Sequence, residues 1–337
     1  MVSIIVLNHN GAHLLTECLH SVLEQTFRDY EVIVVDNAST DGSVSLVERQ
    51  FPQVKLVKLW TNKGFTGGNI AGYKIASGKH IALLNNDTRM CSVWLEKLVE
   101  AMDSDERVGI CSSKIIIDGT NKIDSAGDTF TTAFNGTKVG EYEDEGAYNE
   151  RKYVSGACAA AVLYRKQMLD EIGFLDDDFF FNHEDTDLSL RAWLSGWKCI
   201  FVPEAVVHHK VSATSGILSD LTVYFFTRNV EWVWIKNVPL WLMVRYFPQR
   251  LVYEIGSFVY FCMLKNKWRP FFKGKVDALR EIRHTLYKRN LVQQSIKLKS
   301  KEIRRGLMPI SKYLKIRFSK IRNLHDRQTE CRIQLPM

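Results

Sequence analysis

The first ninety residues alternate between short apolar runs and helix-like stretches, and this alternation constrains the fold more than any other feature. Residues 2–7 and 31–35 are continuous runs rich in Val and Ile, the pattern of strands that are buried on both faces. Further strand-like runs follow at residues 54–59 and 80–84, and helix-like stretches separate all four. Strands that alternate with helices predict right-handed βαβ units. We therefore expect an α/β fold with a mostly parallel sheet flanked by helices.

Polar clusters follow three of these predicted strands. They are Asn8–Asn10, Asp36–Asp41 and Asn85–Thr88. Open α/β sheets bind ligands at the carboxyl ends of their strands, which is where all three clusters fall. The sequence therefore predicts a ligand site at this edge of the sheet.

The second half of the chain is less regular. Residues 118–153 are polar and poorly periodic, which predicts a mixed segment with an antiparallel edge. Residues 188–194 predict a short helix, and residues 198–202 predict a strand that stops at Pro203. From residue 220 to 264 the chain is aromatic and Trp-rich with a helical pattern.

Asp36 is the first candidate for ligand binding. It follows a buried strand, where its carboxylate can accept hydrogen bonds from a nucleobase N–H or from ribose hydroxyls. The alternative is a capping role for the next helix, but Asp41 and Ser39 are better placed for that. Asn8 and Asn10 either frame the same nucleoside or form the turn after the first strand.

The segment from Asn62 to Asn69 contains three glycines. Glycines let backbone N–H groups approach an anion, so the segment is open to interpretation as a phosphate cradle. Its spacing fits neither a Walker loop nor a dinucleotide fingerprint.

Seven motifs in the chain follow one another in an order that resembles a known family. They are Val34–Ser43, Asn62–Phe65 with Gly68-Asn69, Leu83–Thr88, Ser155–Cys158, Glu184–Leu188, Val206–Ser212, and Tyr224 with Arg228-Asn229. Together they resemble the family-two inverting glycosyltransferases, which have the GT-A fold. The chain is most similar to the rhamnosyltransferase-type members that build bacterial cell-surface polysaccharides. The resemblance covers roughly residues 1–235 and implies a catalytic domain there, followed by a helical, aromatic and then strongly basic extension over residues 236–337.

The resemblance implies a divalent cation. Asn86-Asp87 stands at the family's Asp-x-Asp motif, whose last carboxylate holds Mg²⁺ or Mn²⁺ against the donor diphosphate. The first position of the motif is Asn85, so only Asp87 is charged. His209 matches the family's late histidine and implies a metal or pyrophosphate contact, unless it is a structural histidine. Arg228 is the implied diphosphate partner, because a guanidinium binds phosphate oxygens in a bidentate manner, unless it is a solvated surface residue.

The resemblance also assigns the acceptor side. Asp185 is the implied general base that takes the proton of the acceptor hydroxyl, and Glu184 is its acceptor-binding neighbour. The alternative is that these acids only complement the dipole of the helix that follows. Asn62 and Asn69 are implied contacts to the donor.

We therefore expect inverting transfer of rhamnose or another hexose from a nucleotide diphosphate sugar to a saccharide hydroxyl, in cell-surface polysaccharide synthesis. One alternative is a non-catalytic scaffold that binds nucleotide sugars or lipids, against which the intact Asp87, Glu184 and Asp185 argue. Another is a nicotinamide-dependent dehydrogenase, but the glycine fingerprint that should follow its first strand is missing.

Charge and apolar residues are concentrated in the C-terminal part. Residues 265–337 hold 21 Lys and Arg against 5 Asp and Glu, a net charge of +16, whereas residues 1–264 carry −9. The apolar run at residues 255–264 is much shorter than the roughly 20 residues that span a bilayer. An interfacial helical region with aromatic anchors, followed by the basic tail, predicts peripheral binding to an anionic membrane surface and a lipid-linked acceptor. The alternative is that the aromatic residues pack onto the catalytic core.

Other partners and the compartment follow from what accompanies these features. No recognised nucleic-acid motif accompanies the tail, so we do not expect nucleic-acid binding. Seven scattered cysteines are typical of free thiols in a reducing compartment, and Met1 leads directly into a strand. We expect a cytoplasmic protein on the inner face of the plasma membrane.

Overall fold

The structure is a computed structural model that describes residues 1–211 and 218–319. Ser212 of the late motif and residues 320–337 of the basic tail lie outside these ranges. In the described part, ten strands form one mixed sheet, and a separate two-stranded hairpin lies beside it. Four neighbouring strands of this sheet are parallel. In spatial order they are β3 (Lys55–Lys58), β2 (Tyr30–Asp36), β1 (Val2–Asn8) and β4 (His80–Asn85).

The other half of the sheet contains antiparallel pairs. β11 (Ala161–Arg165) runs antiparallel to both β4 and β6 (Val108–Ile117), and β12 (Lys198–His209) runs parallel to β6. Three short strands, all antiparallel to their partners, extend this half: β5 (Thr88–Met90), β7 (Ile123–Ser125) and β10 (Lys152–Val154). The separate hairpin consists of β8 (Asp128–Phe130) and β9 (Gly136–Lys138). The expected α/β fold and the antiparallel edge within residues 118–153 are thus confirmed.

Helices cover both faces of the sheet and bury its apolar side chains. One face packs against α1 (Ala12–Leu23), α2 (Ser43–Gln50) and α4 (Trp94–Asp103). The other face packs against α3 (Gly64–Tyr73), α5 (Lys166–Ile172) and α6 (Glu184–Leu194). β1 and β2 lie between these layers, and both of their faces are buried. Their sequences are therefore continuous apolar runs.

Two element boundaries differ from the sequence prediction. β12 does not stop at Pro203 but continues to His209. A register shift between Val202 and Val206 takes the proline out of the regular ladder, so its missing N–H costs no hydrogen bond there. α6 begins at Glu184, four residues before the predicted start, and its first turn contains three acidic residues. Such acids are favoured there by the helix dipole.

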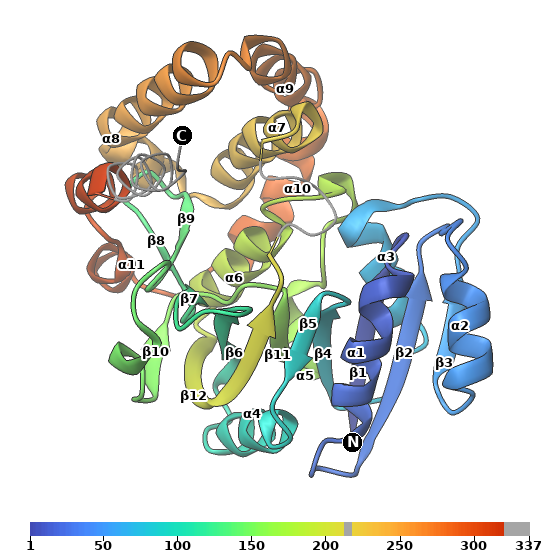
Figure 1. Cartoon of the computed structure of the whole chain (residues 1–337). Coiled ribbons are helices and arrows are strands. Elements are labelled where there is room, and N and C mark those ends of the chain that lie inside the picture. Colours follow the sequence, from blue (N-terminus) through green and yellow to red (C-terminus); the bar gives the residue numbers. More distant parts are fainter. Residues whose placement is uncertain (212–217, 320–337) are drawn as a thin grey trace, which may run out of the picture.

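A helical layer lies above the carboxyl ends of the parallel strands (Figure 1). The arrow of β2 in the figure points towards this end of the sheet. Its elements are α7 (Asp220–Asn237), α8 (Leu240–Phe258), the π-helical segment η3 (Val259–Leu264), α9 (Trp268–Arg280), α10 (Ile282–Gln294) and α11 (Ser300–Gly306). Residues from α9, α10 and α11 are buried in it, among them Phe271, Val292 and Ile303. Much of the predicted basic tail is therefore a packed helical layer. Among the helices of the two described ranges, none has the length and apolar character that crossing a bilayer requires.

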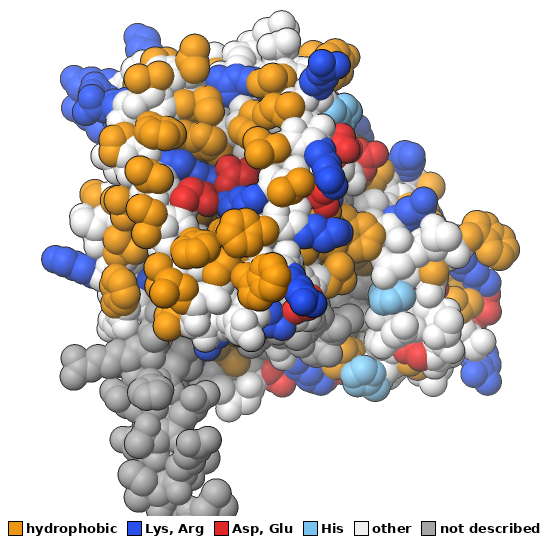
Figure 2. Space-filling view, turned by 90° about the horizontal axis from the view of Figure 1, so that it is seen from above, with side chains coloured by type: hydrophobic (Ala, Val, Ile, Leu, Met, Phe, Trp, Pro, Cys, Tyr) orange, Lys and Arg blue, Asp and Glu red, His pale blue; other side chains and the backbone are white. Residues whose placement is uncertain are grey.

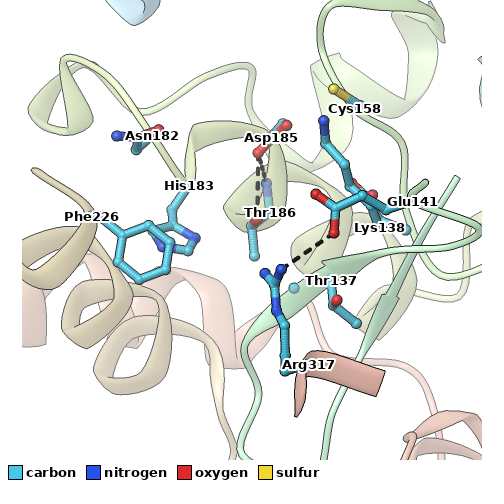
Figure 3. A pocket seen from close by; sticks show the side chains of 12 residues that line it. Thr137, Lys138, Glu141, Cys158, Asn182, His183, Asp185, Thr186, Phe226 and Arg317 are labelled. Atoms are coloured by element: carbon cyan, nitrogen blue, oxygen red, sulfur yellow. Dashed lines mark hydrogen bonds and ion pairs between the residues drawn. The ribbon is translucent and has the colours of Figure 1, made fainter. Parts of the chain in front are cut away.

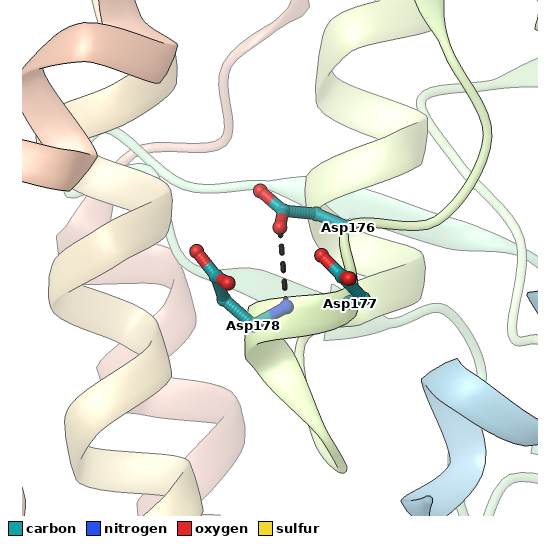
Figure 4. A group of neighbouring side chains, drawn as sticks. All are labelled: Asp176, Asp177 and Asp178. Atoms are coloured by element: carbon teal, nitrogen blue, oxygen red, sulfur yellow. Dashed lines mark hydrogen bonds between the residues drawn. The ribbon is translucent and has the colours of Figure 1, made fainter.

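Three consecutive aspartates connect the sheet and its covering helices, here called the sheet half of the molecule, to this helical layer (Figure 4). They lie at the short helical turn η2 (Asp177–Phe179) and just before it. Lys236 of α7 donates to Asp176 at 2.5 Å and pairs with Asp187 of α6 at 2.8 Å, and Lys288 of α10 contacts both Asp176 and Asp178. Burial raises the pKa of Asp176, but the two ammonium groups outweigh burial and hold the pKa below its ordinary value. The cluster is thus an electrostatic joint between the layers.

Candidate active site

Three of the predicted nucleotide-binding side chains meet at the ends of β1, β2 and β4. Asn8 and Asp36 are direct neighbours in the register of β1 and β2. The Asn8 amide donates to Asp36 Oδ1 at 3.2 Å, and Asn8 Oδ1 accepts from the Asn86 amide at 2.7 Å. Asp36 Oδ2 accepts from the Ser39 N–H at 3.0 Å. All three predicted side chains are buried, and the network fixes them in one arrangement at the edge where ligands bind.

The side chains of this network lie so close to Gly11 that only glycine fits at this position. A Cβ atom at Gly11 would lie 2.1 Å from Asn86 Nδ2 and 2.8 Å from Asn8 Oδ1. Asn10, the remaining candidate at this strand end, has a left-handed backbone with φ of 52°. Its Oδ1 accepts from the Thr40 N–H at 2.8 Å, which ties two loops together. Its role as a nucleotide contact stays a prediction.

The glycine-rich segment forms the start of helix α3, and its role as a phosphate cradle stays a prediction. α3 begins at Gly64, and a Cβ at Gly68 would approach the Leu7 side chain to 2.3 Å. The glycine is therefore needed where α3 packs closely on β1. Asn62 Oδ1 accepts from the Asn37 amide at 2.9 Å, and the Asn69 amide donates to a carbonyl one turn earlier at 2.9 Å. Asn69 Oδ1 is buried without a hydrogen-bond partner among the residues described. The donor contacts of both asparagines stay predictions.

Asp87 and His209 are brought together by the pairing of β5 with the end of β12. His209 Nε2 lies 3.3 Å from Asp87 Oδ1, a contact that falls short of a hydrogen bond, and this buried oxygen has no hydrogen-bond donor in the described part of the chain. His209 Nδ1 lies 2.9 Å from Asp124 Oδ2, and Lys138 donates to the other oxygen of Asp124 at 2.5 Å. Burial alone would lower the pKa of His209, but the two carboxylates raise it to about 9.

The acceptor-side residues open helix α6. Asp185 Oδ1 accepts from the Thr186 N–H at 2.6 Å, and Oδ2 accepts from the Ala159 N–H at 3.3 Å. Burial raises the pKa of Asp185 in spite of these bonds. Glu184 is 6% exposed, and burial and then the charge of Asp185 raise its pKa well above the ordinary value. Two adjacent carboxyl groups thus compete for ionisation in a dry environment.

Asp185 faces a pocket of about 190 Å³ beside the first turn of α6 (Figure 3). The β8–β9 hairpin contributes Asp128 and Lys138 to the lining, and α7 contributes Phe226. Arg317 reaches the pocket from the helical residues 310–319 and pairs with Glu141 at 3.3 Å. The pocket thus combines an aromatic ring with charged side chains that can form hydrogen bonds to hydroxyl groups. Such an environment suits a sugar unit.

Asp128 was missed by the sequence analysis. Its backbone exchanges hydrogen bonds with the Ser155–Gly156 motif, and the shortest runs from Asp128 N to Gly156 O at 2.7 Å. Its Oδ1 is buried and lacks a hydrogen-bond partner among the described residues. Burial, and next the charge of Asp185, raise the pKa of Asp128 to about 7. The Ser155–Cys158 motif, which the sequence identified only through the family resemblance, therefore fixes the position of another carboxyl group in the pocket.

Arg228 and Asn229 hold the loop that precedes α6. The Asn229 amide nitrogen lies within hydrogen-bond distance of the carbonyls of Phe179, Phe181 and Asn182, at 3.0, 2.8 and 2.7 Å, so its two hydrogens are shared among three acceptors. Arg228 Nη2 donates to the Asp178 and Phe179 carbonyls at 2.9 and 3.1 Å. These bonds explain why both residues occur together, and the predicted diphosphate contact of Arg228 stays a prediction.

The loop held in this way has an unusual backbone. Phe180, Asn182 and His183 have φ values of 61°, 69° and 67°, in the left-handed region that non-glycine residues rarely adopt. His183 lines the pocket, and its ring lies 4.6 Å from that of Phe226. Burial lowers the pKa of His183 to about 3, so this imidazole is neutral at physiological pH.

The chain is similar to known glycosyltransferases. The family model described as glycosyl transferase family 2 matches residues 3–173. An uncharacterised glycosyltransferase of Nostoc is 35% identical over 133 residues, which cover 37% of this chain and 40% of that protein. The N-acetylglucosaminyl-diphospho-decaprenol L-rhamnosyltransferase of Mycobacterium tuberculosis is 25% identical over 60% of this chain and 74% of its own.

A solved structure supports the fold independently. The mannosyltransferase of Pyrobaculum calidifontis, in complex with GDP-Man and Mn²⁺, aligns with a TM-score of 0.52 at 18% identity, over 87% of this chain and 85% of that one. With the sheet order and the match over residues 3–173, this likeness confirms the expected GT-A architecture. The chain belongs to glycosyl transferase family 2.

Proposed function

We propose that this protein transfers a sugar from a nucleotide diphosphate sugar to a hydroxyl group of a saccharide acceptor, with inversion at the anomeric carbon. One observation carries the proposal. This chain belongs to a glycosyltransferase family and contains two polar sites. The buried network of Asn8, Asp36 and Asn86 lies at the strand ends, and Asp185 faces a polar pocket. One side offers groups for a nucleotide, and the other offers a base for an acceptor.

The donor side would recognise the nucleoside. Asp36 keeps lone pairs for a nucleobase N–H or ribose hydroxyls, because the network uses each of its oxygens for one bond. Asn62, Asn69, Asn10 and Arg228 complete the proposed donor site.

A divalent cation fits the residues next to this network. Asp87 Oδ1 is a buried anionic oxygen without a hydrogen-bond donor in the described ranges, which is the kind of group that Mg²⁺ or Mn²⁺ binds. We propose that Asp87 holds the cation, with His209 beside it, while Asp124 orients the imidazole through Nδ1. His209 would lose a proton when the cation binds, because only the neutral imidazole tolerates a metal ion next to it. A bound cation would neutralise the charge that develops on the departing diphosphate. The Mn²⁺ in the structure of the Pyrobaculum mannosyltransferase supports this choice.

Asp185 would act as the general base. The acceptor hydroxyl gives its proton to the Asp185 carboxylate, its oxygen forms the bond to the anomeric carbon, and the bond from that carbon to the diphosphate oxygen breaks. A carboxyl group whose pKa is raised by burial is a stronger base than an exposed one, which suits this task near neutral pH. Glu184 and Asp128 would position the acceptor. One displacement without a covalent enzyme intermediate inverts the anomeric centre.

We also propose a lipid-linked acceptor and a place on the inner face of the plasma membrane, in cell-surface polysaccharide synthesis. The name of the mycobacterial relative specifies rhamnose and an acceptor on decaprenol, a lipid alcohol. The net charge of +16 after residue 264 favours an anionic surface. In this proposal, residues 1–235 form the catalytic domain and residues 236–337 form the membrane-facing extension.

A thermal-shift screen of nucleoside diphosphates and nucleotide sugars, with and without Mg²⁺ or Mn²⁺, tests the donor side. A ligand at 100 times its dissociation constant should stabilise the protein by about 2.7 kcal/mol. Asp87→Asn should remove the metal-dependent part, whereas Asp170→Asn, an exposed control, should retain it. Absence of any response to all nucleotides, or metal-dependent stabilisation retained in Asp87→Asn, would contradict the proposal. Transfer of the sugar from the best donor, with anomeric configuration read by NMR, then tests inversion.

A further inference from the structure

The upper face of the helical layer is rich in exposed apolar side chains (Figure 2). We define the α8–α9 face by six of them, each between 48% and 71% exposed. They are Val244, Phe247 and Ile255 of α8, and Trp268, Phe272 and Leu279 of α9. Within each helix these residues recur at spacings of three, four, seven or eight, so they share one side of the helix. Most of the surface of such side chains is left in water, at a cost that a covering apolar medium would remove.

The opposite sides of both helices are already packed. Leu242, Tyr246 and Tyr253 of α8 are buried, as is Phe271 of α9. At Gly274 the approach of α7 is so close that a Cβ atom would lie 2.3 Å from a side-chain oxygen and 2.7 Å from a backbone oxygen of α7. Both helices are therefore amphipathic, with their inner sides committed to the protein core and the α8–α9 face directed outwards. The predicted aromatic anchors divide accordingly, because Tyr246 and Tyr253 pack inside while Phe247 points out.

Basic residues flank this face. Lys265 lies over the ring of Tyr260 at 5.7 Å and Arg269 over that of Trp268 at 5.2 Å, and Arg245 of α8 is exposed. Figure 2 shows further Lys and Arg side chains around and between the apolar ones, together with a few Asp and Glu side chains. The acidic Glu231 and Glu254 are paired with Arg250 and Lys275. An aromatic ring with a cation above it suits the boundary between acyl chains and headgroups, where Lys and Arg stems lie along apolar surface and their charged ends reach phosphate.

We propose that the α8–α9 face inserts into the headgroup region of an anionic bilayer, with both helices in the plane of the membrane. Apolar residues on one side, a basic margin and helices too short and too polar to span are the features of interfacial helices. Charge complementarity selects an anionic lipid surface over a second copy of the chain, because two copies of this face would bring their basic margins together. This inference deepens the proposed membrane location by assigning the surface that mediates it.

The position of α7 gives the docking a consequence. α7 packs against α9 on one side, and its Phe226 lines the pocket that contains Asp185. Only α9 and α7 thus lie between the lipid surface and the acceptor side. An acceptor anchored in the bilayer would need to rise by about two helix diameters, roughly 20 Å, to reach the base.

Co-sedimentation of the full-length protein with vesicles tests the assignment. Vesicles of phosphatidylglycerol and phosphatidylcholine should bind the protein, and pure phosphatidylcholine should bind it much more weakly. Phe247→Glu and Phe272→Glu should each weaken binding to the anionic vesicles by at least ~10-fold, because each removes a large apolar side chain that the bilayer would cover and adds a charge that the anionic lipids repel. The matched control is Trp60→Glu, since Trp60 is 99% exposed in the sheet half.

A second measurement introduces no charge into the α8–α9 face. Brominated lipids quench tryptophans that enter the bilayer. Trp241 of α8 and Trp268 of α9 are both exposed, so the double variant Trp241→Phe/Trp268→Phe should remove most of the quenching, and Trp60→Phe should leave it unchanged. Equal losses in the face and control variants, quenching that survives the double variant, or equal binding to anionic and neutral vesicles would each overturn the proposal. A concentration-dependent dimer that Phe272→Glu abolishes, without vesicle binding by the wild type, would assign the face to a second copy instead. Nucleotide-induced stabilisation should be the same in every variant, which separates this test from that of the sugar transfer.

Discussion

Replacing Asp128 by Asn should make the protein more stable, and increasingly so as the pH rises. Burial and the nearby charge of Asp185 raise the pKa of Asp128 to about 7, from an ordinary value of 3.8. The folded protein therefore keeps a proton on this carboxyl group that the unfolded chain loses near pH 4. Because the folded state binds more protons between these values, the free energy of unfolding falls as the pH rises through this window. Asn has the same size and does not titrate.

The magnitude follows from the two pKa values. About three pKa units, at about 1.36 kcal/mol each, make an upper limit of about 4 kcal/mol for the loss of stability between pH 4 and pH 8. Asp185 shares the titration, so the change belongs to the pair of carboxyl groups rather than to Asp128 alone. We expect Asp128→Asn to match the wild type near pH 4 and to exceed it by about 2–4 kcal/mol at pH 8.

Urea denaturation of both proteins at intervals from pH 4 to pH 8 provides the measurement. Asp170→Asn is the control, because Asp170 forms a surface ion pair with Lys166 and should contribute at most about 1 kcal/mol. A difference between Asp128→Asn and the wild type that stays below about 1 kcal/mol at pH 8, or that shrinks as the pH rises, would refute the burial of a protonated carboxyl group.

Three further predictions concern catalysis, donor binding and the joint between the layers. Asp185→Asn should lower turnover by ~10²–10⁴-fold while donor affinity barely changes, and a larger defect in Glu184→Gln would transfer the role of base to Glu184. Gly11→Ala should weaken donor binding by about 10-fold in thermal-shift titrations, because the added Cβ displaces the amides at the strand ends; unchanged affinity would show that these amides do not contact the donor. Lys236→Ala should lower the free energy of unfolding by about 3 kcal/mol, because it leaves buried carboxylates without their partner, and a change below 1 kcal/mol would argue against the joint.

The sheet half was predictable because its signals are local. β1, β2 and β4 are apolar runs that are buried on both faces, and the polar clusters that follow them meet at one edge. The meeting of Asn8, Asp36 and Asn86 follows directly from the parallel register. The start of α6 was less accessible, because it depends on the left-handed loop before Glu184, which later residues of α7 hold in place.

Asp128 and Lys138 could not be found in the same way. They lie in strands of three residues, which are too short to show alternation between polar and apolar positions. They are cross-strand partners in the hairpin, and the long-range contact of Asp128 with Gly156 sets its position. The sequence also could not predict that Phe247 points outwards and Tyr246 inwards. Both residues are aromatic, and only the packing of the helices determines which of them is buried.

The left-handed loop before α6 has a consequence for how the protein meets its acceptor. Backbone conformations of this kind cost roughly 1–3 kcal/mol each, and here Asn229 and Arg228 stabilise them before any ligand arrives. The entropy of ordering the pocket wall is therefore lost during folding rather than during binding. Association with the acceptor should then resemble docking onto a rigid template, with slow amide hydrogen exchange in this loop even in the unliganded protein.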